Sequence, residues 1–208
     1  MCIRDRDKNP VFHRTKYLNV LSKLVVTPFL AVWDADVIVS CQQIISSIQL
    51  LRHGGADIVY PYDGRFLDTT LKYRKLFIVS SDIKSLYAVQ NHFVLPYGIY
   101  AIGGGFLANR FMYSCSGGEN ENFYGWGPED QERLKRWEIL EYNIKRVEGP
   151  MFHLSHPRGI NSCFGDYKRE EDSIKELLRI CKMSKKELCD EILSLIHISE
   201  PTRQAEIS

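Results

Sequence analysis

The stretch ENENFYGWGPEDQERLKRW, residues Glu119–Trp137, places aromatic rings, glycines and carboxylates directly before a helical pattern. The rings of Tyr124 and Trp126 can stack on the apolar face of a sugar. The carboxylates of Glu129 and Asp130 can hydrogen-bond its hydroxyls or accept a proton from one of them. A proline followed by two acidic residues is typical of a helix N-terminus. The stretch therefore predicts a ligand-binding loop that leads into a helix. An ordinary surface loop with an acidic first turn is the alternative.

The composition is that of a globular domain with little net charge. The chain has 208 residues, of which 44% are hydrophobic and 12% aromatic, and its net charge is +1. This length supports one core and a small appendage, and the charge argues against a nucleic-acid partner. The cysteines include no CxxC pair, which argues against a zinc site and a disulfide framework. No apolar run is long enough for a membrane span. We expect a cytoplasmic protein, located in the cytosol or at the inner face of the membrane.

Two carboxylates follow a predicted strand. Val11–Leu24 has apolar residues at helical spacing, and the apolar run Phe29–Trp33 predicts a buried strand. Asp34 and Asp36 stand at the carboxyl end of that strand, where ligands bind in open α/β sheets. Two such carboxylates can share one divalent cation and the phosphates attached to it. A solvated turn is the alternative, because aspartate is common in turns.

The remaining sequence alternates predicted helices and strands. Helices are predicted over Gln42–Gly54 and Lys168–Ser194. Strands are predicted over Asp57–Tyr60 and Ile144–Val147. The run Gly103–Gly105, before a predicted short helix, permits either a tight turn or close approach of the backbone to a ligand. Helices and strands in alternation predict an α/β fold.

Two histidines lie three residues apart in the segment Met151–Arg158. The segment follows a predicted strand. Either His153 or His156 can therefore give an imidazole nitrogen to a cation that already has carboxylate ligands. A pair of surface histidines without a ligand is the alternative.

In their order along the chain these features resemble a known family. The order is the pattern FxRxxxLN, at Phe12, Arg14, Leu18 and Asn19, then the strand with DxD, the glycine pair, GWGxED and the histidine segment. It resembles the metal-dependent, inverting glycosyltransferases with the GT-A fold. More narrowly, it resembles the C-terminal, galactosyltransferase-like domain of β-1,4-galactosyltransferases and chondroitin-polymerase-type bacterial enzymes. The resemblance implies an N-terminally truncated, Rossmann-like α/β domain with a mixed sheet flanked by helices and a C-terminal helical tail.

The resemblance also implies roles for the residues that match the family's motifs. The donor-binding residues would be Arg14, Asn19, Asp34, Gly103 and Gly104. The acceptor-binding residues would be Tyr124, Trp126, Glu129 and Asp130, with Asp130 also the catalytic base. A Mn²⁺ or Mg²⁺ ion would be bound by Asp36 and His156, with His153 as the less favoured ligand. The family often has glycine at the position of Pro128 and a third acidic residue at that of Gln131, and these differences concern the acceptor.

The implied activity is transfer of a hexose or N-acetylhexosamine from a UDP-sugar to a glycan acceptor with inversion, in bacterial surface polysaccharide synthesis. Displacement from the far face needs a base and a cation but no enzyme nucleophile, and no nucleophile motif occurs in the sequence. Two other classes remain open. A non-catalytic carbohydrate-binding module would use the aromatic loop but not the DxD. A metal-dependent phosphoester hydrolase would use the carboxylates and histidines but not the aromatic loop.

Both ends of the sequence differ from its body. Residues 1–6 and 195–208 resemble translated sequencing-adapter read-through, and we expect both to be artefactual. Between them we expect a partial glycosyltransferase catalytic domain over residues 7–165 and a C-terminal helical segment over residues 166–194.

Overall fold

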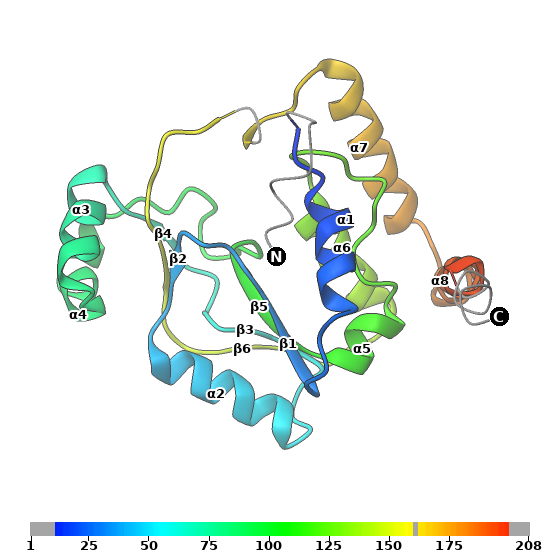
Figure 1. Cartoon of the computed structure of the whole chain (residues 1–208), viewed down its shortest axis with the longest axis horizontal. Helices are drawn as coiled ribbons and strands as arrows, with labels where there is room; N and C mark the ends of the chain where they lie inside the picture. Colours follow the sequence, from blue (N-terminus) through cyan, green and yellow to red (C-terminus); the bar gives the residue numbers. More distant parts are fainter. Residues whose placement is uncertain (1–10, 160–161, 200–208) are drawn as a thin grey trace. The chain divides into compact units, whose positions relative to one another are not determined.

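The computed structural model describes residues 11–159 and 162–199, which form two compact units (Figure 1). The sheet unit contains Val26–Met112 and Tyr142–Pro157, and every strand of the described residues belongs to it. The helical unit contains Tyr113–Glu141 together with residues 11–25 and 158–199. Helix α5 (Arg110–Cys115) runs across the boundary between the two units.

The larger sheet has four strands in the order β1-β5-β3-β6. These strands are β1 (Phe29–Trp33), β5 (Gly105–Asn109), β3 (Ile58–Tyr60) and β6 (Ile144–Arg146). β5 is antiparallel to both of its neighbours, and β3 is parallel to β6. Leu30 and Val32 of β1 are buried and alternate with more exposed residues, as expected of a strand with one face in the core.

The smaller sheet brings together three segments that lie far apart in the sequence. Its order is β2 (Val37–Ile38), β7 (Met151–His153) and β4 (Phe66–Asp68). β2 is antiparallel to β7, with Val37 opposite His153. β4 is parallel to β7, with Asp68 opposite His153. Both sheets are therefore mixed, with parallel and antiparallel pairs. The register of these pairs decides which polar side chains meet.

Helix α2 (Cys41–Arg52) covers part of the larger sheet. It begins with a capping box, in which Ser40 Oγ accepts from the Gln43 backbone N–H at 3.2 Å and the Gln43 side chain accepts from the Ser40 N–H at 2.9 Å. Leu51 packs with Val59 of β3 and Leu107 of β5 in a buried cluster. This cluster fixes α2 against β3 and β5, which both follow it in the chain.

Helices α3 (Leu71–Ser80) and α4 (Ile83–Tyr87) pack on the smaller sheet, beside β4 in Figure 1. The one-turn helix η2 (Gln90–His92) follows α4. Tyr73 and Phe77 of α3 contact a buried cluster that contains Leu86 of α4 and Phe152 of β7. The cluster is largely aromatic, with the Tyr73 and Phe93 rings 5.3 Å apart.

The helical unit contains α1 (Arg14–Ser22), α6 (Glu129–Ile139), α7 (Tyr167–Cys181) and α8 (Lys185–Ser199). Helix α1 contacts the loop before α6 through polar side chains. Thr15 Oγ1 donates to the Phe123 carbonyl at 2.9 Å, and Asn19 Nδ2 donates to the Glu119 carbonyl at 2.9 Å. The apolar residues at helical spacing in Val11–Leu24 do not form a buried face, because Leu21 is 46% exposed and Leu24, beyond the end of α1, is 71% exposed. Helix α1 is therefore held by hydrogen bonds more than by apolar packing.

The predicted α/β fold, with mixed sheets and flanking helices, is confirmed. One local expectation was wrong. The glycine run leads first into strand β5, and the expected short helix begins only at Arg110. None of the helices in the described part of the chain has the length and apolar character needed to cross a bilayer.

The predicted segment boundaries at residues 6, 165 and 194 stay predictions. Residues 1–6 and 200–208 lie outside the described residues, and α8 continues past Ser194 to Ser199. Helix α8 begins with a capping box, in which Ser184 Oγ accepts from the Glu187 N–H at 3.3 Å. The Ser184 N–H donates in turn to the Glu187 carboxylate at 2.8 Å.

Candidate active site

In the sheet unit, Asp36 and the two predicted histidines meet in one cluster. Asp36 Oδ2 lies 2.8 Å from His156 Nε2 and 3.6 Å from His153 Nε2. The three candidate ligand atoms all lie within 4.8 Å of one another. The cluster forms because β2 pairs with β7, and the Leu154 N–H donates to the Asp36 carbonyl at 2.7 Å. Its half-buried side chains leave one side of the cluster accessible.

A second carboxylate orients His153. Its Nδ1 lies 2.7 Å from Asp68 Oδ1, across the β4–β7 pair, and its ring stacks on that of Phe66 at 5.3 Å. A histidine whose Nδ1–H is bound by a carboxylate presents Nε2 as an acceptor, which is the usual arrangement around histidine ligands to a metal. Asp68 thus supports His153 as a ligand equal to His156.

The carboxylates and imidazoles of the cluster shift one another's titration. His153, followed by His156, holds the pKa of Asp36 below its ordinary value. Asp36 raises the pKa of His153, with a further contribution from Asp68. The imidazole must be neutral to bind a metal, so a metal and a proton would compete for His153.

The predicted donor-binding residues of the sheet unit lie beside this cluster. The Asp34 N–H donates to the Gly104 carbonyl at 2.9 Å, and Tyr62 Oη donates to the Gly103 carbonyl at 2.7 Å. Gly104 has φ +87°, and a Cβ there would lie 2.6 Å from Met151 Sδ. Glycine is needed at this position because both the backbone conformation and the packing against β7 exclude a side chain. The glycine pair Gly103–Gly104 therefore contacts both the DxD segment and β7, the strand that carries His153.

In the helical unit, the predicted carboxylate pair lies at the start of α6. Glu129 is buried and Asp130 is half-buried. The guanidinium of Arg14 lies 3.7 Å from Glu129 Oε1 and 3.9 Å from Asp130 Oδ1. Arg133, one turn later on the same helix, forms an ion pair with Asp130. Fixed positive charge thus surrounds both carboxylates.

Glu129 is the carboxylate with the larger change in acidity. Burial, followed by the neighbouring charge of Asp130, raises the pKa of Glu129 to about 7. Glu129 Oε2 is buried and accepts no hydrogen bond from the residues that the structure describes. Two carboxylates this close share protons, so the pair holds one proton more readily than an isolated residue would near neutral pH.

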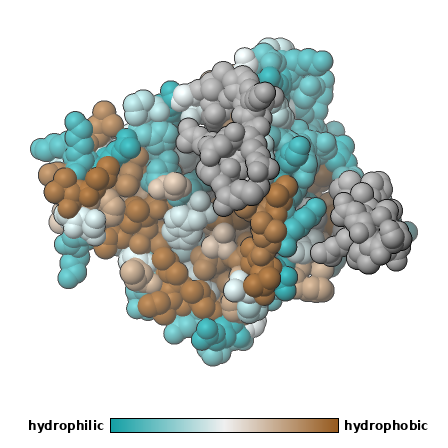
Figure 2. Space-filling model, in the orientation of Figure 1, coloured by the Kyte–Doolittle hydropathy of each residue, from teal (hydrophilic) through white to brown (hydrophobic). Residues whose placement is uncertain are grey.

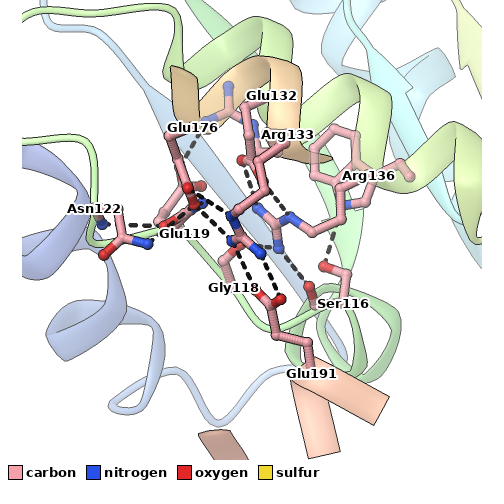
Figure 3. Close-up of polar contacts among 12 residues, drawn as sticks. Ser116, Gly118, Glu119, Asn122, Glu132, Arg133, Arg136, Glu176 and Glu191 are labelled. Carbon is pink, nitrogen blue, oxygen red and sulfur yellow. Dashed lines mark hydrogen bonds and ion pairs between the residues drawn. The ribbon is translucent and has the colours of Figure 1, made fainter. Parts of the chain in front are cut away.

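Behind the pair lies a buried polar network that anchors it, shown in Figure 3. Arg133 donates to Glu119 Oε2 at 2.7 Å, and Tyr113 Oη donates to Glu119 Oε1 at 2.9 Å. Burial and the Glu119 charge raise the pKa of Tyr113. Arg136 bonds the Glu132 carboxylate at 2.9 Å and the Gly118 carbonyl at 2.8 Å. The network ties the first two turns of α6 to the loop that precedes it.

Of the three rings in the loop, Phe123 is buried, Tyr124 is half-buried and Trp126 is exposed. Tyr124 Oη donates to the Val11 carbonyl at 3.3 Å, and the Arg169 guanidinium lies 5.3 Å from the Tyr124 ring centre. Trp126 is 41% exposed and contacts the Phe164 ring edge-on at 4.8 Å. Trp126 is therefore the ring available for stacking on a ligand.

The predicted site residues fall into two groups. The sheet unit brings together Asp34, Asp36, Gly103, Gly104, His153 and His156. The helical unit brings together Arg14, Asn19, Tyr124, Trp126, Glu129 and Asp130. The side-chain amide of Asn19 is hydrogen-bonded to the loop before α6. Its Oδ1 accepts from the Glu119 N–H at 2.8 Å, and its Nδ2 donates to Glu121 Oε1 at 2.9 Å. Its donor-binding role, like the other assigned roles, stays a prediction.

Sequence reasoning missed three residues of these groups. Asp68 stands at the end of a short strand, a position that could have marked it. Arg133 stands three residues after Asp130 on a predicted helix, a spacing that favours an ion pair. Nothing local in the sequence marks Glu119 as a buried partner.

Comparisons with known proteins show a similarity over part of the chain. A family model described as the N-terminal domain of galactosyltransferase matches residues 84–157, which include the glycine pair, GWGPED and both histidines. No curated protein matches the sequence. The catalytic domain of Drosophila β1,4-galactosyltransferase 7, solved in complex with xylobiose, has 19% sequence identity and a TM-score of 0.43. That match covers 65% of this chain and 45% of the other, so it spans less than half the length of that protein.

The family match supports a galactosyltransferase-like glycosyltransferase. It supports the resemblance to galactosyltransferases in its broad form. The narrower resemblance to the C-terminal domain of chondroitin-polymerase-type bacterial enzymes stays a prediction.

Proposed function

We propose that this chain carries part of the catalytic domain of an inverting, metal-dependent glycosyltransferase. Its donor is a UDP-sugar, its transferred group a hexose or N-acetylhexosamine, and its acceptor a glycan. The product would belong to a bacterial surface polysaccharide, made in the cytoplasm or at the inner face of the membrane. The galactosyltransferase match over residues 84–157 supports the reaction class.

The observation that carries the proposal is the convergence of Asp36, His153 and His156. Three candidate ligand atoms within 4.8 Å of one another suit a single cation. Asp36 directly precedes β2, His153 ends β7 and His156 follows it in the chain, and both histidines lie inside the segment that matches the family. The DxD lies beyond that segment, so the pairing of β2 with β7 links it to the family match.

The donor set fits a first-row divalent ion. One carboxylate and two imidazoles suit Mn²⁺ better than Mg²⁺, which prefers an all-oxygen environment. A bound ion would supply Lewis-acid neutralisation of the diphosphate leaving group. Asp36, His153 and His156 would hold it, and Asp68 would keep Nε2 of His153 directed at it.

The base in the proposed reaction is Asp130. In the proposed reaction the acceptor hydroxyl oxygen forms a bond to the anomeric carbon as the bond from that carbon to the UDP oxygen breaks. The hydroxyl proton passes to Asp130, which Arg133 and Arg14 hold in place. Glu129 would hydrogen-bond the acceptor, and Trp126 would stack on a sugar ring.

The test is calorimetric titration of UDP into the protein with Mn²⁺ and then with chelator. Wild-type protein should bind UDP with Mn²⁺ and lose most of that binding with chelator. Asp36→Ala should behave in Mn²⁺ as the wild type does in chelator. Asp82→Ala is the matched control, because Asp82 is an exposed helix cap in the same unit. UDP binding that is the same with Mn²⁺, with chelator and in Asp36→Ala would contradict the proposal.

A further inference from the structure

Helix α3 is apolar on both of its sides, yet only one side is covered. Tyr73 and Phe77 face the buried aromatic cluster of the sheet unit. The other side exposes Leu71 (53%), Leu76 (53%), Ile78 (59%) and Val79 (88%), and no residue of α3 is buried. Contiguous exposed apolar side chains often mark an interaction site. The exposed side is therefore a candidate docking surface.

The segment after η2 adds further exposed apolar side chains to the sheet unit. It begins at Phe93, which packs on Tyr73 of α3 with the rings 5.3 Å apart. Tyr97 (54%), Ile99 (53%) and Tyr100 (80%) are then exposed in turn. Exposed tyrosines beside exposed aliphatic residues are typical of a membrane–water interface, where the ring is apolar and the hydroxyl is wet.

Basic residues are interspersed with these apolar ones. From Leu71 to Tyr100 the sequence has four basic residues, Lys72, Arg74, Lys75 and Lys84, and one acidic residue, Asp82. Figure 2 shows the result as hydrophilic and hydrophobic atoms side by side over α3 and α4. Elsewhere the chain is almost neutral, so this positive charge is local.

We propose that α3 and the segment through Tyr100, together the α3 surface, dock on an anionic lipid bilayer. The apolar side chains enter the headgroup region, and the lysines contact lipid phosphates. Charge complementarity favours lipid over a protein partner, because Lys72 and Lys75 are exposed on α3 and the sequence from Leu71 to Tyr100 has a single acidic residue. The proposal goes beyond the glycosyl transfer proposed above and does not depend on it.

Docking of the α3 surface would also bring the bilayer close to the histidine segment. Arg74 Nη1 donates to the Ser155 carbonyl at 3.2 Å, and Ser155 directly precedes His156. Arg74 therefore faces the protein, which leaves the neighbouring lysines to contact lipid. A bilayer-bound α3 would hold the histidine segment near the membrane surface.

The experiment is co-sedimentation of the protein with vesicles of phosphatidylglycerol and phosphatidylcholine, compared with pure phosphatidylcholine. Binding should require phosphatidylglycerol and weaken with salt. Lys75→Glu should lower the partition coefficient by about fivefold or more, since one basic residue near the surface contributes about that factor. Val79→Asp should lower it further.

Two substitutions serve as matched controls in the same unit. Val26 is 87% exposed, close to the 88% of Val79, and lies outside the α3 surface. Lys145 is an exposed lysine of β6. Val26→Asp and Lys145→Glu should leave vesicle binding unchanged, with circular dichroism checking the fold of all four variants.

Failure to bind anionic vesicles at low salt would overturn the proposal. So would binding that Val79→Asp and Val26→Asp weaken equally. Self-association of the wild-type protein that Val79→Asp abolishes, in light scattering without lipid, would show a second copy of the chain as the occupant and would also overturn it.

Discussion

The sheet unit and the helical unit each carry a carboxylate site, and the groups around the two sites differ in kind. Asp36 faces two imidazoles, which can lose a proton and become metal ligands. Glu129 and Asp130 face the guanidiniums of Arg14 and Arg133, which stay charged. A cation can replace protons at the first site but is repelled at the second. The comparison favours Asp36 as the proposed metal ligand and the Glu129–Asp130 pair as the proposed site of proton transfer.

The largest effect is expected at Arg133, which is buried with Glu119. Arg133→Met leaves the Glu119 charge buried without its partner and should lower the free energy of unfolding by about 3–5 kcal/mol. Urea denaturation measures the change. Arg179→Met is the control, because Arg179 pairs with Glu176 and Glu191 on a more exposed surface and should cost less than about 1 kcal/mol. Equal losses in the two variants would contradict a structural role specific to Arg133.

Glu129→Gln tests whether the carboxylate pair stores a proton. The pKa of Glu129 is raised to about 7 in the folded state, so the native protein loses stability as pH rises from about 4.5 to about 7. The amide removes this loss. At pH 8 the variant should be more stable by about 2–3 kcal/mol, and at pH 4 the two proteins should be nearly equal.

Thermal unfolding across that pH range measures the effect. Glu138→Gln is the matched control on the same helix, because Glu138 is exposed and pairs only with Lys135 in the described structure. A Glu129→Gln protein with the same pH dependence as the wild type would show that Glu129 has the same pKa in the folded and unfolded states.

Asp68→Asn tests the support behind the metal site. Without the carboxylate, His153 loses the partner that directs Nε2 at Asp36, and Mn²⁺ affinity should fall about 10–100-fold. Calorimetry with Mn²⁺ alone measures it. The substitution Asp63→Asn, at a half-buried aspartate that pairs with Arg65, should leave Mn²⁺ affinity unchanged. If both variants bind Mn²⁺ like the wild type, Asp68 does not orient a ligand.

The smallest effect is expected at Asn19, which joins α1 to the loop before α6. Asn19→Ala removes its side-chain hydrogen bonds to Glu119 and Glu121 and should lower the free energy of unfolding by about 1 kcal/mol. The same variant separates two roles. Weaker UDP binding with unchanged stability would favour donor binding, whereas lower stability with unchanged UDP affinity would favour loop anchoring.

The parts of this account that follow from the sequence are local ones. Strand β1, helix α2 and the acidic start of α6 were predictable because apolar spacing and capping residues act within a few positions. The DxD and the histidine segment were predictable as candidates because each follows a strand. Strand β5 was missed because its first residue belongs to a glycine run that suggests a turn.

The remaining parts depend on pairings that no local pattern encodes. Asp68 meets His153 only because β4 pairs with β7, and the two residues are 85 positions apart. Glu119 is buried because Arg133 and Tyr113 reach it from two helices. Such contacts are fixed by tertiary register rather than by spacing in the sequence.

The central claim is that Asp36, His153 and His156 bind one divalent cation. The most direct measurement is titration of Mn²⁺ followed by electron paramagnetic resonance, with the wild type, Asp36→Asn and His156→Gln compared at equal protein concentration. The account predicts one Mn²⁺ bound per wild-type chain and a loss of affinity of about 10-fold or more in each variant. Equal Mn²⁺ binding by all three proteins, or none by the folded wild type, would contradict it.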